Sequence, residues 1–407
     1  MNRILHVNAT YSEGGAAQIA RTLHQQLNKK SEFVSYFAHG RGKKSTNENV
    51  YKFTLTFEVY LHALITRLIG LEGSGTFLST KKLINFVEKS NFSIIHLHNI
   101  HGYYLNFEFI KFLKEFDVSV VWTLHDGWAM TGNCAYWFKC KKWESGCLDC
   151  NHKDYYPKNY INFSNLMWNK KKKVFSTDWD PILVTPSKWL ADKVSKSFLG
   201  KHEIKTIPNA IDTDLFRPQP KTSLREKFNL TKDNKILLFA ASDLENERKG
   251  AKYFFESLKY VNVDDLVILT IGKKIKAYKN INKDIKQLGY ISNRKLLSEI
   301  YNEADLFCTT SLDEVFGLTV TEAMSSGTPV VAFNVGGIAE QITEDCGLLV
   351  EPRNIKELAN KLKELLINDQ KRKKMSLNSR KRAVNKYSIN KFSKDYFRLY
   401  QDILEEE

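Results

Sequence analysis

The sequence predicts an α/β protein with two Rossmann-like domains, each built on a parallel sheet. Short apolar runs of strand type alternate with helical patterns through both halves of the chain, as repeated βα units do. The chain has 407 residues, which is enough for two domains with separate cores. Between the halves, residues 204–218 contain two prolines and no helical period, which is typical of a linker.

In the first half, polar side chains follow the strand patterns at the ends where a ligand would bind. These patterns lie at residues 3–7, 93–98, 119–124 and 182–185. His98 and His101 lie at and after the end of the second pattern. His125 and Asp126 follow the third. Ligands of open α/β sheets bind beyond the carboxyl ends of the strands, so a site is expected here, although a single histidine more often makes a structural hydrogen bond.

Residues 52–71 form an apolar, aromatic and lightly basic stretch with two interpretations. It is either a core helix of the first domain or an amphipathic surface segment that meets lipid. Interfacial helices usually have a broad polar face rich in lysine and arginine, and this stretch does not, so a core helix is expected. Residues 168–173, WNKKKK, form a basic cluster that is either solvated or binds lipid phosphates.

Four cysteines lie close together in the first half, and they are Cys134, Cys140, Cys147 and Cys150. The last two form a C-x-x-C pair, a spacing that suits zinc ligation by thiolates, and His152 is nearby. No export signal is recognised, so the thiols are expected to be reduced, which favours a metal over disulfides. The alternative is a set of small buried thiols or a redox-labile pair.

The second half repeats the alternation of strands and helices. Strands are expected at residues 235–240, 266–271, 304–309 and 330–333. Helices are expected at residues 355–367, 369–386 and 390–404. The last helix places four apolar or aromatic side chains on one face, namely Phe392, Tyr396, Leu399 and Tyr400. Such a stripe is typical of a helix that packs on a core.

The most specific stretch of the chain is residues 313–337, DEVFGLTVTEAMSSGTPVVAFNVGG. A helix is expected from Leu318 to about Ser325. Glu314 precedes this helix and Glu322 lies within it, about 12 Å away at 1.5 Å per residue. The free N–H groups at the helix start lie between the two carboxylates and can hold an anion. A sugar nucleotide has this layout, with hydroxyls at both ends and a diphosphate in the middle.

This string resembles the donor-binding signature of the retaining glycosyltransferases of family 4. Members have the GT-B fold, in which two Rossmann-like domains face a central cleft. Glu314 and Glu322 match the two glutamates of the E-x7-E motif of that family. The resemblance implies that Glu314 binds hydroxyls of the donor sugar and that Glu322 binds the ribose. It also implies that the N–H groups of Phe316, Gly317 and Leu318 hold the diphosphate.

Two further segments of the first half match this family. Gly14 and Gly15 correspond to its first glycine-rich loop, which closes over the donor diphosphate. His125 matches the active-site histidine. The resemblance implies that the acceptor meets residues close to this histidine, with Asp126, Trp128 and His101 as the candidates. Asp126 is alternatively expected to orient the imidazole of His125.

The donor half also carries the basic loop of the family, with one departure. Lys249 fits the lysine that binds the diphosphate. Asp243 stands where the family has an arginine, so Arg248 is expected to replace that arginine. Losing the arginine would remove a bidentate phosphate contact. Tyr290 and Ile291 match the segment whose backbone meets the nucleobase.

A cysteine-containing insert similar to residues 130–155 occurs in a subgroup of these enzymes that resembles capsule and colanic-acid transferases. Its aromatic side chains, Trp137, Phe138 and Trp143, are expected either to stack on a sugar acceptor or to pack the insert. The expected domains are an acceptor-side domain at residues 1–203 and a donor-binding domain at 204–387. By resemblance, a final helix at residues 388–407 crosses back onto the first domain.

Composition limits the partners and the compartment. The formal net charge of +15 suits an anionic partner such as nucleotide phosphates or an anionic membrane face, although a lysine-rich proteome would give the same value. No nucleic-acid-binding module is recognised. No apolar run is long enough to span a membrane. The expected location is therefore the cytoplasm, with peripheral contact at the inner face of the membrane.

The resemblance implies retaining transfer of a sugar from a nucleotide-sugar donor to a glycan or a lipid-linked glycan, in capsule, lipopolysaccharide or other surface polysaccharide synthesis. Catalysis is expected to require no cofactor or divalent cation, and any zinc is expected to be structural. One alternative is a sugar-nucleotide epimerase or phosphorylase of the same architecture. Another is a non-catalytic partner subunit, against which the presence of Glu314, Glu322 and His125 argues.

Overall fold

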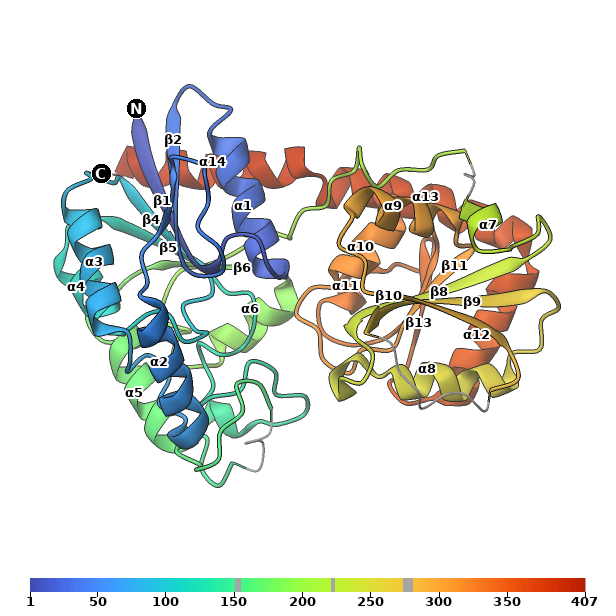
Figure 1. Ribbon diagram of the computed structural model, residues 1–407, viewed down its shortest axis with the longest axis horizontal. Coiled ribbons are helices and arrows are strands. Elements are labelled where there is room, and N and C mark those ends of the chain that lie inside the picture. Colours follow the sequence, from blue (N-terminus) through green and yellow to red (C-terminus); the bar gives the residue numbers. More distant parts are fainter. Residues whose placement is uncertain (151–154, 221–223, 274–280, 407) are drawn as a thin grey trace. The chain divides into compact units, whose positions relative to one another are not determined.

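The computed structural model describes residues 1–150, 155–220, 224–273 and 281–406, which divide into two compact units. Unit 1 consists of Met1–Ile207 and Ser393–Glu407, and unit 2 of Pro208–Phe392 (Figure 1). Each unit has one parallel sheet with helices on it, so the predicted α/β fold of two Rossmann-like domains is confirmed.

The sheet of unit 1 has seven parallel strands in the order β3-β2-β1-β4-β5-β6-β7. The strands are β1 (Asn2–Thr10), β2 (Phe33–Arg41), β3 (Val50–Lys52), β4 (Ile94–Leu97), β5 (Ser119–Thr123), β6 (Ile182–Thr185) and β7 (Ile204–Thr206). The chain adds β2 and β3 on one side of β1 and the later strands on the other. This reversal makes the carboxyl ends of β1 and β4 the topological switch point, where open α/β sheets bind ligands.

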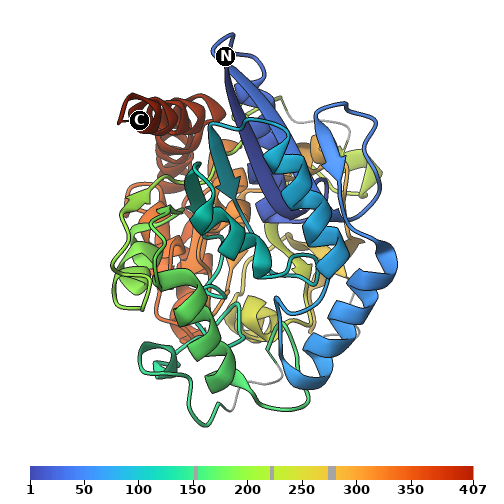
Figure 2. The same ribbon diagram turned by 90° about the vertical axis from the view of Figure 1, so that its left-hand side faces the viewer.

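The helices of unit 1 are α1 (Gly15–Leu27), α2 (Thr56–Ile69), α3 (Phe77–Glu88), α4 (Glu108–Glu115), α5 (Ser164–Ser176) and α6 (Lys188–Ser195), with a 3-10 turn η1 (Lys142–Glu144). Most of α14 (Ile389–Glu406) also belongs to this unit (Figures 1 and 2). The predicted apolar face of α14 is buried. Tyr400 hydrogen-bonds His96 of β4 and Tyr396 bonds Thr123 of β5, so α14 is anchored to the sheet.

The sheet of unit 2 has six parallel strands in the order β10-β9-β8-β11-β12-β13. They are β8 (Lys235–Asp243), β9 (Leu266–Lys273), β10 (Asp284–Gly289), β11 (Leu306–Thr309), β12 (Val330–Phe333) and β13 (Gly347–Val350). The helices are α7 (Leu224–Lys227), α8 (Ala251–Ser257), α9 (Arg294–Glu303), α10 (Leu318–Ser325), α11 (Ile338–Gln341), α12 (Ile355–Ile367) and α13 (Asp369–Tyr387), with 3-10 turns η2 (Glu247–Lys249) and η3 (Leu258–Tyr260). Apolar side chains of the strands form one buried core on each face of this sheet.

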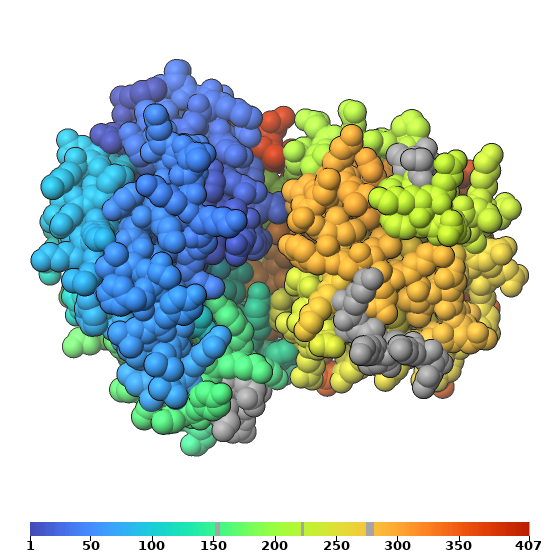
Figure 3. Space-filling model, in the orientation of Figure 1, coloured from blue at the N-terminus to red at the C-terminus, as the bar shows by residue number. Residues whose placement is uncertain are grey.

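The core helix expected within residues 52–71 is the one element that the sequence analysis placed wrongly. A helix forms there, α2, but its buried side chains are Glu58, His62 and Thr66, and five of its large apolar side chains are exposed. It lies at the surface of unit 1, in blue (Figures 1 and 3). Among the residues that the structure describes, no helix is long and apolar enough to cross a membrane.

Candidate active site

Strand register in unit 1 brings two of the predicted histidines together. Leu97 of β4 pairs with Trp122 of β5, so the residues just beyond these positions emerge at the same edge of the sheet. His98 Nδ1 lies 3.1 Å from His125 Nε2, within hydrogen-bond distance. The two rings are stacked, with their centroids 5.4 Å apart. The hydrogen bond of His98 is therefore structural and also part of the candidate site, because it positions the imidazole of His125.

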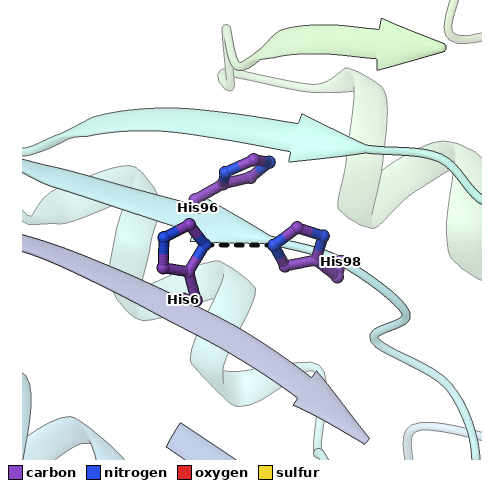
Figure 4. A group of neighbouring side chains, drawn as sticks. All are labelled: His6, His96 and His98. Carbon is purple, nitrogen blue, oxygen red and sulfur yellow. Dashed lines mark hydrogen bonds between the residues drawn. The ribbon is translucent and has the colours of Figure 1, made fainter. Parts of the chain in front are cut away.

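Behind His98, the hydrogen-bonded chain of imidazoles continues into the sheet. His6 of β1 lies beside it, with His6 Nδ1 at 3.1 Å from His98 Nε2 (Figure 4). His96 stacks on His98 with centroids 4.2 Å apart. The nitrogens of His96 are engaged elsewhere, at 2.6 Å from the Tyr400 hydroxyl and 2.7 Å from Thr123 Oγ1. The sequence pattern predicted His6 and His96 only as strand residues, since the pairing of their imidazoles depends on strand register.

All four of these imidazoles are neutral at neutral pH. Burial lowers the pKa of His6, His96 and His98 well below the usual value, and neighbouring imidazoles lower it further. Burial also lowers the pKa of His125, to about 4. Nitrogens of His6, His96 and His98 lie within 4.8 Å of one another, the only such group of three metal-ligand side chains in the described part of the chain. Each of these histidines already bonds a hydroxyl or another imidazole, so hydrogen bonding accounts for the cluster.

The direction of the chain follows from its buried end. A neutral imidazole has one N–H, so the chain His6–His98–His125 must donate in a single direction. His6 Nε2 is buried without a hydrogen-bond partner among the described residues. Buried N–H groups without an acceptor are rarer than buried acceptors without a donor, so this nitrogen carries the lone pair. His6 therefore donates to His98, His98 donates to His125, and His125 carries its proton on Nδ1.

Asp126 pairs with a different histidine from the one beside it in the sequence. Its Oδ2 lies 2.9 Å from His101 Nε2, and its Oδ1 accepts the Trp128 N–H at 3.0 Å. Burial alone would raise the pKa of Asp126, yet His101 and the Trp128 N–H hold it below the usual value. Asp126 is thus a buried carboxylate that orients His101, and no hydrogen bond joins it to His125 among the described contacts.

A buried lysine that sequence reasoning missed lies under these groups. Lys171 belongs to the basic run in α5, but its Nζ is buried and donates to the Trp128 and Thr131 carbonyls at 2.6 and 3.2 Å. It also lies 3.5 Å from the centre of a Trp128 ring. Burial lowers the pKa of Lys171 to about 7. Trp128 is only 1% exposed and is engaged here, so the structure does not present it as a surface for an acceptor.

The cysteine insert packs on this region. Cys134 and Cys147 are buried, and the Gly132 N–H donates to Cys147 Sγ at 3.1 Å. Burial raises the pKa of Cys134 well above its usual range and that of Cys147 to about 11, and nearby cysteines raise both further. Within the described residues, no three cysteine sulfurs lie within 4.8 Å of one another. His152 and residues 151–154 of the insert lie outside the described residues.

The aromatic side chains of the insert mostly pack it. Trp137 and Trp143 are each 2% exposed. Trp137 stacks on Trp189 of α6 with ring centroids 5.3 Å apart. Phe138 is partly buried and contacts Tyr155, with centroids 4.9 Å apart. Of the two roles expected for these rings, the geometry therefore matches packing.

In unit 2, Glu314 lies in a cluster of partly buried charges. Lys249 Nζ donates to Glu314 Oε2 at 2.6 Å, and Arg248 Nη1 donates to the same oxygen at 2.9 Å. Burial alone would raise the pKa of Glu314, but the two cations hold it below the usual value. Arg248 and Lys249 thus reach the same carboxylate oxygen. Asp243 instead accepts the Glu245 N–H at 3.0 Å in the turn after β8.

A glycine pair holds the backbone of Glu314. The Gly337 N–H donates to the Glu314 carbonyl at 2.9 Å. Gly336 has a φ of +51°, and a Cβ there would lie 2.0 Å from the same carbonyl oxygen. Only glycine fits so close to another backbone with a positive φ. The Gly-Gly at the end of the signature therefore fixes the position of Glu314.

The second glutamate lies across the start of α10. Glu322 is 5% exposed, and its Oε1 accepts from Arg294 Nη1 at 3.3 Å. Burial raises the pKa of Glu322 in spite of Arg294. The first hydrogen bond of α10 is donated by the Val320 N–H to the Gly317 carbonyl, at 3.1 Å, so the N–H groups before it are available to an anion. Arg294 was not among the predicted residues, because nothing in the spacing from Arg294 to Glu322 signals their contact.

The remaining donor-binding candidates are accessible. Gly14 is exposed at the start of α1 with a φ of +89°, and a Cβ there would meet nothing within 4 Å. Gly15 opens the helix and is also exposed. Tyr290 is 73% exposed after β10, and Ile291 is half-buried.

Comparison with known proteins relates both halves of the chain to families of sugar-transferring enzymes. Residues 13–215 match the family model described as Glycosyltransferase Family 4. Residues 220–382 match the one described as Glycosyl transferases group 1.

Two curated relatives are similar to different extents. The chain is 26% identical over 375 residues to the putative colanic acid biosynthesis glycosyl transferase WcaC of Escherichia coli K12, a match that covers 87% of this chain and 89% of that protein. It is 27% identical over 226 residues to an Escherichia coli UDP-Gal:alpha-D-GlcNAc-diphosphoundecaprenol alpha-1,3-galactosyltransferase, over 52% of this chain and 57% of that protein.

Solved structures share the fold at low sequence identity. A sucrose-phosphate synthase from Thermosynechococcus elongatus superposes with a TM-score of 0.74 at 16% identity, over all of both chains. Anabaena HepE in complex with UDP-glucose superposes with a TM-score of 0.69 at 15% identity, over 98% of this chain and 99% of that one. These likenesses show the fold, which is GT-B.

The direction of the imidazole chain can be measured directly. In protein labelled with 15N-histidine, we expect the Nδ1 of His125 to show the chemical shift of a protonated nitrogen and its Nε2 that of an unprotonated one. His98 and His6 should show the same tautomer, and signals are assigned by their loss in single histidine-to-glutamine variants. An unprotonated Nδ1 at His125 would mean that the chain donates in the opposite direction.

The spacing of the four cysteines predicts about one zinc ion per chain, and binding it would have to draw together sulfurs of which no three lie within 4.8 Å of one another among the described residues. Elemental analysis of protein purified without an affinity tag measures this content. A Cys134→Ser, Cys147→Ser double variant should lose the metal, whereas Cys308→Ser, in the core of unit 2, should keep it. Metal-free protein with freely titrating cysteines would show that the insert is held by packing alone.

Proposed function

The chain belongs to the family 4 and group 1 glycosyltransferases, and from this premise we propose that it is a retaining enzyme, moving a sugar from a nucleotide-sugar donor to a glycan or lipid-linked glycan acceptor. The observation that carries the proposal is the pair of glutamates, Glu314 before the α10 start and the buried Glu322 after it, each paired with at least one cation. The relatives named for colanic acid and diphosphoundecaprenol-linked acceptors support synthesis of a surface polysaccharide.

The charges in unit 2 suit a nucleotide diphosphate and a sugar. The cations Lys249 and Arg248 neutralise Glu314 in this structure, and a donor diphosphate would give them a second anionic partner. Glu314 would then accept hydrogen bonds from sugar hydroxyls. The free N–H groups at the α10 start add fixed dipoles directed at the same charge. A UDP donor is supported by the relative that is a UDP-Gal galactosyltransferase and by the HepE complex with UDP-glucose.

For the chemical step, we propose that the acceptor attacks the sugar on the face from which the diphosphate leaves. The configuration at the anomeric carbon is therefore retained. The acceptor oxygen forms a bond to the anomeric carbon while the bond from that carbon to the phosphate oxygen breaks. The acceptor proton passes to the departing diphosphate, so no separate base is required. Fixed cations and dipoles stabilise the developing charge on the diphosphate, which removes the need for a divalent cation.

His125 contributes a hydrogen-bond donor in this scheme, not a base. Its imidazole is neutral, and its Nε2 lone pair is engaged by His98. The remaining Nδ1–H can donate to an oxygen of the sugar or of the acceptor. We therefore assign His125 to orientation and to stabilisation of charge in the transition state.

The donor is identified first, by a thermal-shift screen of nucleoside diphosphates and nucleotide sugars, because a ligand that binds the native state raises its stability. With the donor that gives the largest shift, transfer requires an acceptor. Epimerisation or hydrolysis of the donor without an acceptor would identify an epimerase, and glycoside cleavage that depends on added phosphate would identify a phosphorylase. If no donor raises the melting temperature, the chain would be a non-catalytic subunit.

Substitution of either glutamate by glutamine should lower kcat/KM at least tenfold, or about 1.4 kcal/mol. A carboxylate that accepts a hydroxyl hydrogen bond contributes about 1.5–3 kcal/mol, and the amide loses most of it. The variants are Glu314→Gln and Glu322→Gln, and the exposed Glu344→Gln is the matched control. If both variants keep near-normal activity with an intact melting transition, the donor-site assignment is wrong.

The product made from an α-linked donor should have an α linkage, and excess chelator should not reduce the rate. Proton NMR of the anomeric signal reports the linkage, and the rate is followed with and without chelator. The chelator concentration must leave any zinc of the cysteine insert in place, as checked by elemental analysis. A β-linked product would rule out retention, and a rate restored only by added magnesium or manganese would rule out metal-independent transfer.

A further inference from the structure

Helix α2 has the reverse of the usual amphipathic orientation, with its apolar face toward solvent. Its exposed face carries Phe57, Tyr60, Leu61, Leu64 and Leu68, at the spacing of one side of a helix. Tyr60 is 73% exposed and Leu64 is 54% exposed. A soluble surface helix normally turns its apolar stripe toward the core and its polar residues toward water, and α2 does the reverse.

The inward face of α2 explains why the helix cannot simply rotate. Glu58 accepts hydrogen bonds from the backbone N–H groups of Leu78 and Ser79, at 2.9 and 2.8 Å, at the start of α3. His62 Nε2 accepts the Gly73 N–H at 3.0 Å. Turning the apolar stripe inward would leave the buried donors of this loop without acceptors, which is costly. The exposure of the apolar face is therefore built into the contacts of α2.

The exposed stripe is continued by two neighbouring segments. Phe77 and Leu78, at the start of α3, are 62% and 56% exposed. Tyr160 and Ile161 lie beside the end of α2, because their N–H groups donate to the Arg67 and Leu68 carbonyls. Their side chains are also exposed. Together with the stripe of α2, these four side chains form what we call the α2 surface, and grouped apolar exposure of this kind marks an interaction site.

The charges around the α2 surface have one sign. Between residues 55 and 87 the only acids are Glu58 and Glu72, and both are buried. The exposed charged side chains of that segment are Arg67, Lys81 and Lys82. The segment from 155 to 176 contains no acid, and apart from the buried Lys171 it contains four lysines. The apolar surface is thus bordered by cations, which suits a partner that is apolar inside and anionic at its surface.

We propose that the α2 surface is a membrane-docking site that inserts its aromatic and leucine side chains into the headgroup boundary of an anionic bilayer. Interfacial helices bind in this way, through buried apolar area together with the attraction of lysine and arginine to anionic lipids. The proposal deepens the proposed function and rests on it for its purpose, since a lipid-linked acceptor is held in a bilayer. The docking itself depends only on the exposed side chains and the charges.

The test is flotation with two kinds of vesicle, phosphatidylcholine alone and phosphatidylcholine with phosphatidylglycerol. The protein should float with the anionic vesicles and much less with the neutral ones. Leu64→Asp should weaken that partitioning about tenfold or more, because an apolar side chain is replaced by an anion. The matched control is Leu377→Asp, which changes an even more exposed leucine of α13 and should float like the unchanged protein.

Three outcomes would overturn the proposal. One is no flotation with anionic vesicles, and another is equal loss in the Leu64 and Leu377 variants. The third is a protein that does not bind vesicles but forms a dimer in analytical ultracentrifugation, with Leu64→Asp dissociating the dimer. That result would assign the α2 surface to a second copy of the chain.

Binding of UDP, measured by calorimetry, separates this proposal from the proposed function. Leu64→Asp should bind UDP like the unchanged protein, since α2 belongs to unit 1 and the donor-binding candidates Glu314 and Glu322 to unit 2. Vesicle binding by a protein that binds no nucleotide would leave the docking site standing and remove the proposed donor. UDP binding without vesicle binding would support the proposed donor and rule out the docking site.

Discussion

Parallel strand pairing is the constraint on which both halves of this protein depend. In a parallel sheet every strand ends at the same edge, so residues distant in the chain emerge side by side. Pairing of β8 with β11 brings the Lys249 loop next to Glu314, and pairing of β1, β4 and β5 aligns His6, His98 and His125. One geometrical rule thus assembles a charged cluster in one unit and a neutral one in the other.

The two clusters handle burial in opposite ways. Glu314 remains ionised because two cations reach it, and the group keeps a charge that a substrate can exploit. Burial makes the histidines neutral, and one hydrogen bond joins each imidazole of the chain to the next. A buried group must be either paired or neutral, and these two clusters use one solution each. For the histidines the result is an imidazole with one fixed donor.

The strand and helix pattern and the glutamate signature could be predicted from the sequence, since both depend on local spacing. Glu314 and Glu322 stand in one continuous string with the helix start between them. Contacts between elements could not be predicted in this way. Arg294 reaches Glu322 from the previous helix, and Lys171 is buried in a lysine run that looks solvated. The orientation of helix α2 could not be predicted either, because its composition is that of a core helix, while the loop after it needs hydrogen bonds from the polar face.

Anchoring of α14 to the first sheet has a consequence for synthesis of the protein. The hydroxyls of Tyr396 and Tyr400 complete the hydrogen bonds of Thr123 and His96, which are made some 270 residues or more earlier in the chain. Domains generally fold in the order in which the ribosome delivers them. Here the amino-terminal unit emerges first but lacks its last helix until translation has passed through the whole of the other unit. The unit that is begun first is therefore the one that is finished last.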